Sequence, residues 1–286
     1  MFGLAKPKHP LVSVVRHSDF KIDKKFTEQR FILDMYLISL KGNQKSILKY
    51  GRNQYDFQEG SMVFISANQV FSSSSTDFSE AEDEWTLVVH VDFVHSMNLF
   101  NSIRQYPFFN YEEHEALHLS NEENQSLTSI IYKIEDEYNQ RIDTHTNEII
   151  AINIESLLKY CQRYYSRQFI TRKTQNKGIL IQFEQFLTNY MQTGLVEKGM
   201  PTVADCGEAL NLSPYYLSDL LKIETGKSAK EHIDLALVEK AKALLLNSND
   251  NINEIAYELG FDYPNHFSKL FKSKTGISPK TYRSLN

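Results

Sequence analysis

Residues Ile255–Lys272 read IAYELGFDYPNHFSKLFK, and their pattern specifies the architecture of the C-terminal part of the chain. An earlier stretch, Cys206–Lys222, reads CGEALNLSPYYLSDLLK and carries the same pattern. Pro214 and Pro264 lie 50 positions apart, whereas the residues before the turn lie 49 apart, so the first turn is one residue shorter. Two copies in register are much harder to obtain by chance than one.

Each copy predicts two short helices joined by a turn. Apolar residues recur at intervals of three and four before each turn, which gives each helix one buried face. Asn211 and Gly260 occupy the turns, and both residue types tolerate a positive φ. The second helix of each copy begins at a proline, whose missing N–H costs nothing there, and it ends at Gly226 or Gly276. The apolar residues of these second helices are expected in the core: Leu217, Leu220, Phe267, Leu270 and Phe271.

A resemblance to a known family rests on Ile255–Lys272 together with the residues that follow it, Gly276-Ile277-Ser278-Pro279 and Tyr282-Arg283. These residues resemble the DNA-binding signature of AraC-type regulators. The resemblance covers about 100 residues of the chain. It implies two helix–turn–helix units joined by a long helix, here at about Ala229–Leu246. Such a helix would hold two recognition helices in major-groove segments about 34 Å apart.

The exposed N-terminal face of each second helix is where a recognition helix contacts bases. The Asn265 amide can pair with adenine, and the Lys269 ammonium can donate to guanine. The Asp219 carboxylate can accept from the amino group of cytosine, but it repels phosphate. Alternatively, some of these side chains only cap or solvate their helix, and Arg283 either touches the DNA backbone or pairs with a neighbouring acid. The candidate base readers are Asn265, His266 and Lys269 in the second copy and Tyr215, Tyr216, Ser218 and Asp219 in the first, with Lys272, Lys222 and Arg283 on phosphate.

The formal charge of the chain is −5, which by itself argues mildly against nucleic acid. The charge is uneven, because the segment from Pro264 to Asn286 holds five basic residues and no acidic one. This run is either a solvated face or a local footprint for phosphate. Its coincidence with the second recognition helix favours phosphate, with binding that weakens steeply as salt rises.

The residues from Leu11 to Asp92 predict short strands separated by polar turns. Several short strands suggest a small barrel or sandwich. The stretch Asp56–Val70 resembles the cupin-like sensor domain that precedes the DNA-binding domain in many AraC-type regulators. The expected fold class is therefore α+β, with an N-terminal cupin-like β-barrel flanked by helices and an all-α C-terminal domain. The expected strands are Val12–His17, Arg30–Leu40, Gln44–Tyr50, Ser61–Ser66 and Trp85–Val91.

Beyond Phe93 the pattern becomes helical, with long amphipathic segments at Glu122–Gln140 and Asn147–Arg167. These two helices either cover the barrel or pair with a second copy of the chain. Residues 166–178 are polar and lack periodicity, so we expect a linker there. The expected domains are residues 1–165 for sensing and dimerisation and residues 179–286 for DNA binding.

Five residues of the N-terminal part are candidates for an effector pocket, although they also suit an ordinary barrel interior: Arg16, His17, Tyr36, Trp85 and His90. A cupin-type metalloenzyme with a helical accessory domain is the alternative function. It needs clustered histidines and a carboxylate, yet His90 and His95 fall on opposite faces if both lie on a strand. We therefore expect no metal site, no cofactor and no enzymatic activity. Cys161 and Cys206 are expected to be free and buried.

The sequence is most consistent with a sequence-specific transcriptional regulator of the AraC type. Its expected partners are double-stranded DNA, a second copy of the chain, a small-molecule effector and RNA polymerase. A protein-interaction adaptor is a third reading, but it leaves the acid-free stretch after Pro264 unexplained. Residues Met1–Pro7 lack the apolar core of a signal peptide and no stretch is apolar enough to span a membrane, so a cytoplasmic protein is expected.

Overall fold

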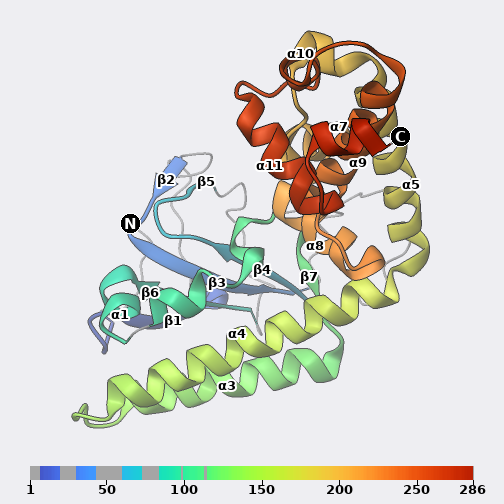
Figure 1. Cartoon of the computed structure of the whole chain (residues 1–286). Coiled ribbons are helices and arrows are strands. Elements are labelled where there is room, and N and C mark those ends of the chain that lie inside the picture. Colours follow the sequence, from blue (N-terminus) through green and yellow to red (C-terminus); the bar gives the residue numbers. More distant parts are fainter. Residues whose placement is uncertain are drawn as a thin grey trace. The chain divides into compact units, whose positions relative to one another are not determined.

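Two units divide the chain in the computed structural model, Met1–Gln168 and Phe169–Asn286 (Figure 1). The structure describes residues 7–19, 30–42, 60–72, 84–97, 99–112 and 115–285. The expected strand at Gln44–Tyr50 and the first part of the Asp56–Val70 stretch, before Gly60, lie outside these residues.

An antiparallel sheet forms the framework of the first unit. Its five strands have the order β1-β6-β3-β4-β7, and a separate pair joins β2 to β5. Within the described residues, β1 and β7 are edges of the larger sheet, so a closed cupin-like barrel is not formed by these strands. The strands are β1 (Val12–Arg16), β2 (Arg30–Ile32), β3 (Met35–Lys41), β4 (Ser61–Ile65), β5 (Val70–Ser72), β6 (Trp85–His90) and β7 (Leu117–His118).

Side-chain alternation gives the larger sheet one apolar face. Leu40 lies opposite Trp85 on β6 and opposite Met62 on β4, and all three side chains are buried. The indole N–H of Trp85 donates to the hydroxyl of Thr128 on α3 (Asn121–Asn139) at 3.1 Å, so this face packs against the helices. Burying such strands on one face fixes their register, because a slip of one residue would turn every apolar side chain outward.

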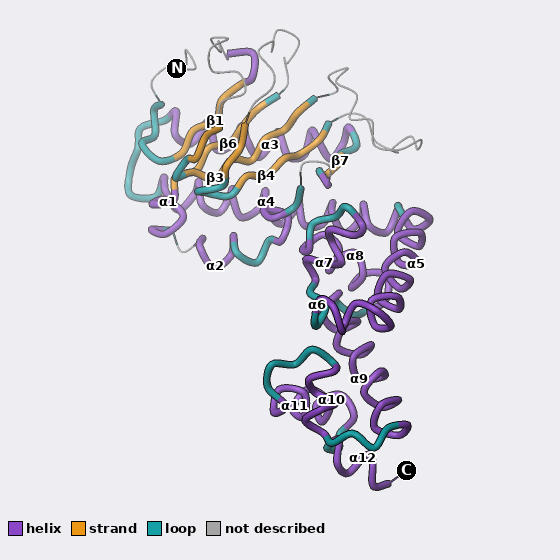
Figure 2. The backbone as a smooth tube through the Cα atoms, turned by 90° about the horizontal axis from the view of Figure 1, so that it is seen from above, coloured by secondary structure: helices purple, strands orange, loops and turns teal. Residues whose placement is uncertain are grey.

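The long helices α3 and α4 (Thr146–Thr171) run antiparallel beneath the sheet (Figures 1 and 2). A capping box starts α3, since the Ser120 hydroxyl accepts from the Glu123 N–H while the Glu123 carboxylate accepts from the Ser120 N–H. The predicted inward faces of both helices are confirmed. The buried residues are Leu127, Ile130, Ile131, Ile134 and Tyr138 on α3, and Ile150, Ile154, Leu157, Leu158, Cys161 and Tyr165 on α4.

Shorter elements connect the strands to these helices. The expected strand at Arg30–Leu40 is interrupted, because β2 ends at Ile32 and β3 begins at Met35. The chain leaves β6 directly into α1, where His95 lies, so His90 and His95 do not share a strand. The short helices are α1 (Val91–Ser96) and α2 (Leu99–Ile103), with 3-10 turns η1 (His17–Asp19) and η3 (Pro107–Asn110).

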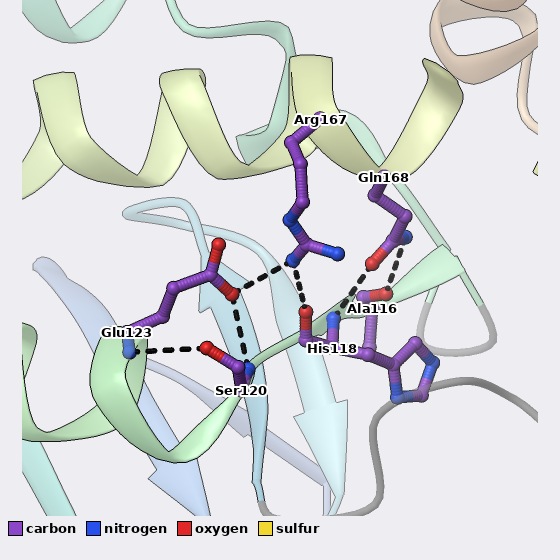
Figure 3. A network of polar contacts seen from close by, with 6 residues as sticks. All are labelled: Ala116, His118, Ser120, Glu123, Arg167 and Gln168. Carbon is purple, nitrogen blue, oxygen red and sulfur yellow. Dashed lines mark hydrogen bonds and ion pairs between the residues drawn. The ribbon is translucent and has the colours of Figure 1, made fainter. Parts of the chain in front are cut away.

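A polar network ties the end of α4 to the edge strand β7 (Figure 3). The Gln168 side chain accepts from the His118 N–H at 2.8 Å and donates to the Ala116 carbonyl at 3.2 Å, as a neighbouring strand would. Arg167 donates to the His118 carbonyl and to the Glu123 carboxylate. The expected linker at 166–178 is therefore largely helical, since α4 continues to Thr171 and α5 begins at Lys173. Its polar composition reflects hydrogen bonding and exposed helix faces rather than absent secondary structure.

The second unit is entirely helical in the residues described. Within it, α9 contacts α7 and α8 near one end and α10, α11 and α12 near the other. Throughout the described chain, every helix is too short or too polar to span a bilayer. The elements are α5 (Lys173–Asn189), the one-turn π-helix η5 (Tyr190–Gly194), α6 (Leu195–Lys198), α7 (Val203–Leu210), α8 (Pro214–Thr225), α9 (Ala229–Asn247), α10 (Ile252–Glu258), α11 (Pro264–Thr275) and α12 (Pro279–Leu285).

The two cysteines are free and buried, as predicted. Burial raises the pKa of both thiols, that of Cys206 to about 11. Thiolates are the reactive form, so both side chains act as apolar core residues.

Candidate nucleic-acid interface

Both copies of the repeat fold as a helix, a turn and a second helix. In the first copy the Leu212 N–H donates to the Gly207 carbonyl at 2.9 Å. In the second copy the Phe261 N–H donates to the Ala256 carbonyl at 3.0 Å. In both copies an N–H donates to the carbonyl five residues earlier and closes the turn. Residues that align in the sequences of the two copies therefore occupy equivalent places in the structure.

Backbone geometry explains the residues at the turns. Asn211 has φ of 55° and Gly260 has φ of 83°, as their residue types predict. A Cβ on Gly207 would lie 2.5 Å from the Leu212 carbonyl oxygen. The small residue at this position is therefore required by the close approach of the turn to α7.

The recognition helices α8 and α11 end alike. Gly226 and Gly276 adopt left-handed conformations, and their N–H groups donate to the carbonyls of Lys222 and Lys272 at 2.9 and 2.8 Å. The predicted end of each recognition helix is confirmed.

Helix α9 is the spacer between the two copies. Its 19 residues extend about 28 Å at about 1.5 Å each. Its side chains Ile233, Leu237, Ala241 and Leu245 are buried, while Leu244 is half-buried. A continuous helix with core residues along its length holds both copies within one packed unit.

Residues 206–284 match a family model described as a helix-turn-helix domain. The part of the C-terminal unit that contains both copies, residues 206–284, is an AraC-type helix-turn-helix domain. The uncharacterised HTH-type transcriptional regulator YisR of Bacillus subtilis is 34% identical over 96 residues, which are 34% of this chain and 33% of YisR. The C-terminal domain of AraT, a response regulator from Geobacillus stearothermophilus, is 33% identical, with 38% of this chain and 85% of that chain covered and a TM-score of 0.34.

A further relative of this chain carries an enzymatic name. The bifunctional transcriptional activator/DNA repair enzyme AdaA of Bacillus subtilis is 27% identical over 146 residues, which are 51% of this chain and 67% of AdaA. The chain thus spans only a third of the length of YisR and two thirds of that of AdaA.

The second recognition helix of the AraC-type domain presents the predicted side chains to solvent. Asn265, His266, Lys269 and Lys272 are all exposed, whereas Phe267 and Phe271 are buried as expected. The helix carries three lysines and no acid. Its outer face can therefore offer an amide, an imidazole and ammonium groups to a ligand without local repulsion of phosphate.

The first recognition helix of the AraC-type domain is less open. Tyr215 and Lys222 are exposed, and Ser218 and Asp219 are half-buried. The prediction that Tyr216 reads bases disagrees with its position, because only 5% of this residue is exposed and its ring packs on Phe169. Tyr216 follows the exposed Tyr215 and lies about 100° further around the helix, which places it on the inner face against Phe169.

Arg283 serves the interior of the AraC-type domain. Its Nε donates to the Leu245 carbonyl at 3.0 Å and its Nη1 to the Asp250 carbonyl at 2.7 Å. The Leu245 carbonyl belongs to the last turn of α9, where carbonyls lack helical partners. Arg283 thus caps the spacer helix from α12, which differs from both expected roles, a phosphate contact and an ion pair with an acid.

The five candidate effector residues do not meet in one pocket. Arg16 pairs with Glu135 and stacks over Tyr132, and Trp85 is fully buried, both on the face that meets α3. Tyr36 packs edge-on against Phe109 on this face. His17 points to the opposite face, and His90 accepts from the Asp92 N–H to cap α1.

A buried polar chain on that opposite face was not singled out from the sequence, except for His17. His17 Nδ1 lies 2.7 Å from the Glu84 carboxylate and Nε2 lies 2.8 Å from the Thr86 hydroxyl. The Thr86 hydroxyl in turn lies 2.8 Å from that of Ser39. The available signal was a pair of polar residues, Ser39 and Thr86, at strand positions that the structure buries. Within the described residues, no three His, Cys, Asp or Glu side chains gather closely enough to hold a metal ion, either at this polar chain or away from it.

Proposed function

We propose that this protein is a sequence-specific transcriptional regulator that binds duplex DNA through α8 and α11. The observation that carries the proposal is the pair of equivalent recognition helices on one spacer, of which α11 has an exposed, acid-free outer face. The span of α9, about 28 Å, is close to the distance of about 34 Å between successive major-groove segments.

The two recognition helices take unequal parts in this proposal. Lys269, Lys272 and Lys274 give α11 three positive charges, whereas α8 holds Lys222 with Asp219 and Glu224. Phosphate attraction is the sequence-independent part of DNA affinity. The second copy therefore supplies most of the phosphate contacts, and the first contributes base contacts from Tyr215 and Ser218.

The first unit is proposed to dimerise the protein through α4. Ile149, Ile152 and Tyr160 are exposed and fall on one stripe of this helix, at 100° per residue. A second copy of the chain would cover this stripe. Sedimentation of Ile152→Lys tests the idea, because a charge in an apolar interface should convert a dimer to a monomer, whereas an unchanged mass would remove α4 from the interface.

A sensor role and a cupin-like architecture for the first unit belong to the same proposal. The sensor role is supported by the buried polar chain of His17, Glu84, Thr86 and Ser39, whose imidazole, carboxylate and hydroxyl groups would offer hydrogen bonds to an effector. The cupin-like architecture is supported only by the antiparallel sheet of short strands. RNA polymerase is the further partner that such a regulator, working in the cytoplasm, would meet at a promoter.

The competing metalloenzyme has no specific observation in its favour. Its requirement is a cluster of metal ligands, and the described residues hold none. Elemental analysis of the purified protein tests it directly, since stoichiometric iron, manganese or zinc would favour the enzyme. We propose no catalytic activity for the chain.

Selection from a random pool of duplexes tests the regulator itself. The wild type is expected to enrich one sequence, and mobility shifts on that duplex should weaken at least about tenfold for Asn265→Ala and Lys269→Ala. Lys242→Ala, which removes a lysine bonded to Glu239 on α9, is the matched control and should bind normally. If both α11 variants bound the duplex as tightly as the wild type, Asn265 and Lys269 would not lie on the face that contacts bases.

A further inference from the structure

Tyr263 is a residue that the fold does not explain. It stands at the N-cap of α11, directly before Pro264, and its side chain accepts no hydrogen bond from the helix. It is 64% exposed, so the phenol ring also contributes little to the core. In the other copy the equivalent residue is Ser213, which is buried and accepts from the Tyr216 N–H at 3.2 Å.

The absence of a side-chain cap at Tyr263 makes α11 less stable, and the exposed ring gives little core packing in compensation. Side-chain oxygens cap the other helices of both repeats and the spacer between them, so α11 is the exception among these elements. An oxygen cap typically stabilises a helix, and Tyr263 forgoes it. Residues that break a local rule without a folding benefit mark functional positions. The capping residues are Thr202 for α7, Ser213 for α8, Ser228 for α9 and Asn251 for α10.

The Tyr263 ring has an aromatic neighbour on the first turn of α11. Its edge contacts the His266 ring, with centroids 5.4 Å apart and an interplanar angle of 63°. His266 is itself exposed on the N-terminal turn of the recognition helix. Two exposed rings therefore lie at the N-terminal end of the helix, on either side of Asn265 in the sequence, where base edges are contacted in a helix–turn–helix complex.

We propose that Tyr263 is a specificity-determining residue that contacts the C5-methyl group of a thymine, with His266 orienting its ring. The methyl group is the one apolar feature that base pairs display in the major groove, and apolar side chains are its matching partners. This inference rests on the proposed DNA-binding function. It adds a base reader outside the helix proper, on the residue before its proline.

The experiment uses the full chain and a duplex selected by the wild type from a random pool. Each thymine of that duplex is replaced in turn by deoxyuridine, which removes only the methyl group, and binding is measured for wild type, Tyr263→Ser and Tyr263→Phe. One replacement should weaken the wild type and Tyr263→Phe by about fivefold, and should leave Tyr263→Ser unaffected. Tyr263→Ser should also bind the unmodified duplex less tightly while melting at the same or a higher temperature, because it restores the cap of the first copy.

Two outcomes would overturn the inference while leaving the regulator intact. One is a Tyr263→Ser variant that keeps both the wild-type affinity and the wild-type response to every deoxyuridine. The other is a uniform loss of affinity with that response unchanged, which would place the ring on the sugar–phosphate backbone. Tyr257→Ser, an exposed tyrosine of α10, is the matched control and should keep the wild-type pattern. Failure of the wild type to select any sequence would instead refute the proposed function, and this inference with it.

Discussion

The ring of Phe169 packs against the ring of Tyr216 with 4.9 Å between their centroids. Phe169 lies in the last turn of α4 and is the first residue of the C-terminal unit, and Tyr216 is the third residue of α8. The Phe169 carbonyl also accepts from the Asn176 side chain at 2.7 Å. The N-terminal end of the first recognition helix is thus part of a small buried core that starts where this unit starts.

Substitution of Tyr216 should therefore act on folding rather than on base recognition. Tyr216→Ala should lower the free energy of unfolding by about 3 to 5 kcal/mol, because it leaves a cavity where a large ring is buried. Tyr216→Phe keeps the ring and should change DNA affinity by less than about twofold. Urea unfolding measures the free energy of unfolding, and mobility shifts on a selected duplex measure the DNA affinity. A Tyr216→Phe variant that folds normally but loses DNA binding would restore Tyr216 as a base reader.

A matched pair of glycines tests how closely the second turn packs. Gly260 and Gly276 share a φ of 83°, but a Cβ on Gly260 would lie 2.5 Å from the Met200 nitrogen, whereas one on Gly276 would meet nothing within 4 Å. Gly276→Ala should cost only the left-handed penalty of about 1 to 2 kcal/mol. Gly260→Ala should cost a further ~1 to 3 kcal/mol from overlap. If urea unfolding showed the same loss of stability for both variants, the loop at Gly199 would have moved aside at no cost in free energy.

The sequence predicted the repeat well because each copy is specified locally. Asn211, Gly226, Gly260 and Gly276 need only their own backbone conformations, and the structure gives all four a positive φ. Exposure could not be predicted in the same way. Tyr216 packs against Phe169, which lies 47 residues earlier. A contact between residues so far apart in the chain cannot be predicted from the local sequence pattern.

The N-terminal unit shows the same limit. Apolar periodicity identified the buried faces of α3 and α4, since the residues on the buried face of a helix recur every three or four positions in the sequence. Arg16 and Trp85 suggested a pocket by residue type alone, and their helix partners Glu135 and Thr128 lie far along the chain. Which strand residues meet is set by register and by distant helices, so the five candidates separated onto two faces.

Salt dependence distinguishes a phosphate contact from a base contact. Lys272 is exposed on the last turn of α11, and its loss should reduce the slope of log K against log salt by about 0.9. The weakening should be similar for selected and random duplexes, whereas Lys269→Ala should reduce the preference between them. Titrations at several salt concentrations measure both effects. An unchanged slope for Lys272→Ala would place this lysine away from the DNA.

His232 on α9 should make the stability of the C-terminal unit depend on pH. Its Nε2 lies 2.8 Å from the Thr225 hydroxyl at the end of α8, and its ring contacts Phe183 edge-on. Burial, followed by the charge of Lys227, lowers the pKa of His232, against the opposing effect of Glu184 and Glu231. The folded state thus favours the neutral imidazole.

A lowered pKa in the folded state means that the unfolded chain binds the proton more readily. The stabilisation from neutral His232 is fully present above the unfolded pKa of about 6.5, and it is lost as the pH falls through the lower folded value. His232→Gln retains an amide for Thr225 but does not titrate. Melting temperatures between about pH 5 and 8 should therefore fall less steeply on acidification for His232→Gln than for the wild type. Parallel curves for the two proteins would show that protonation of His232 is not coupled to unfolding.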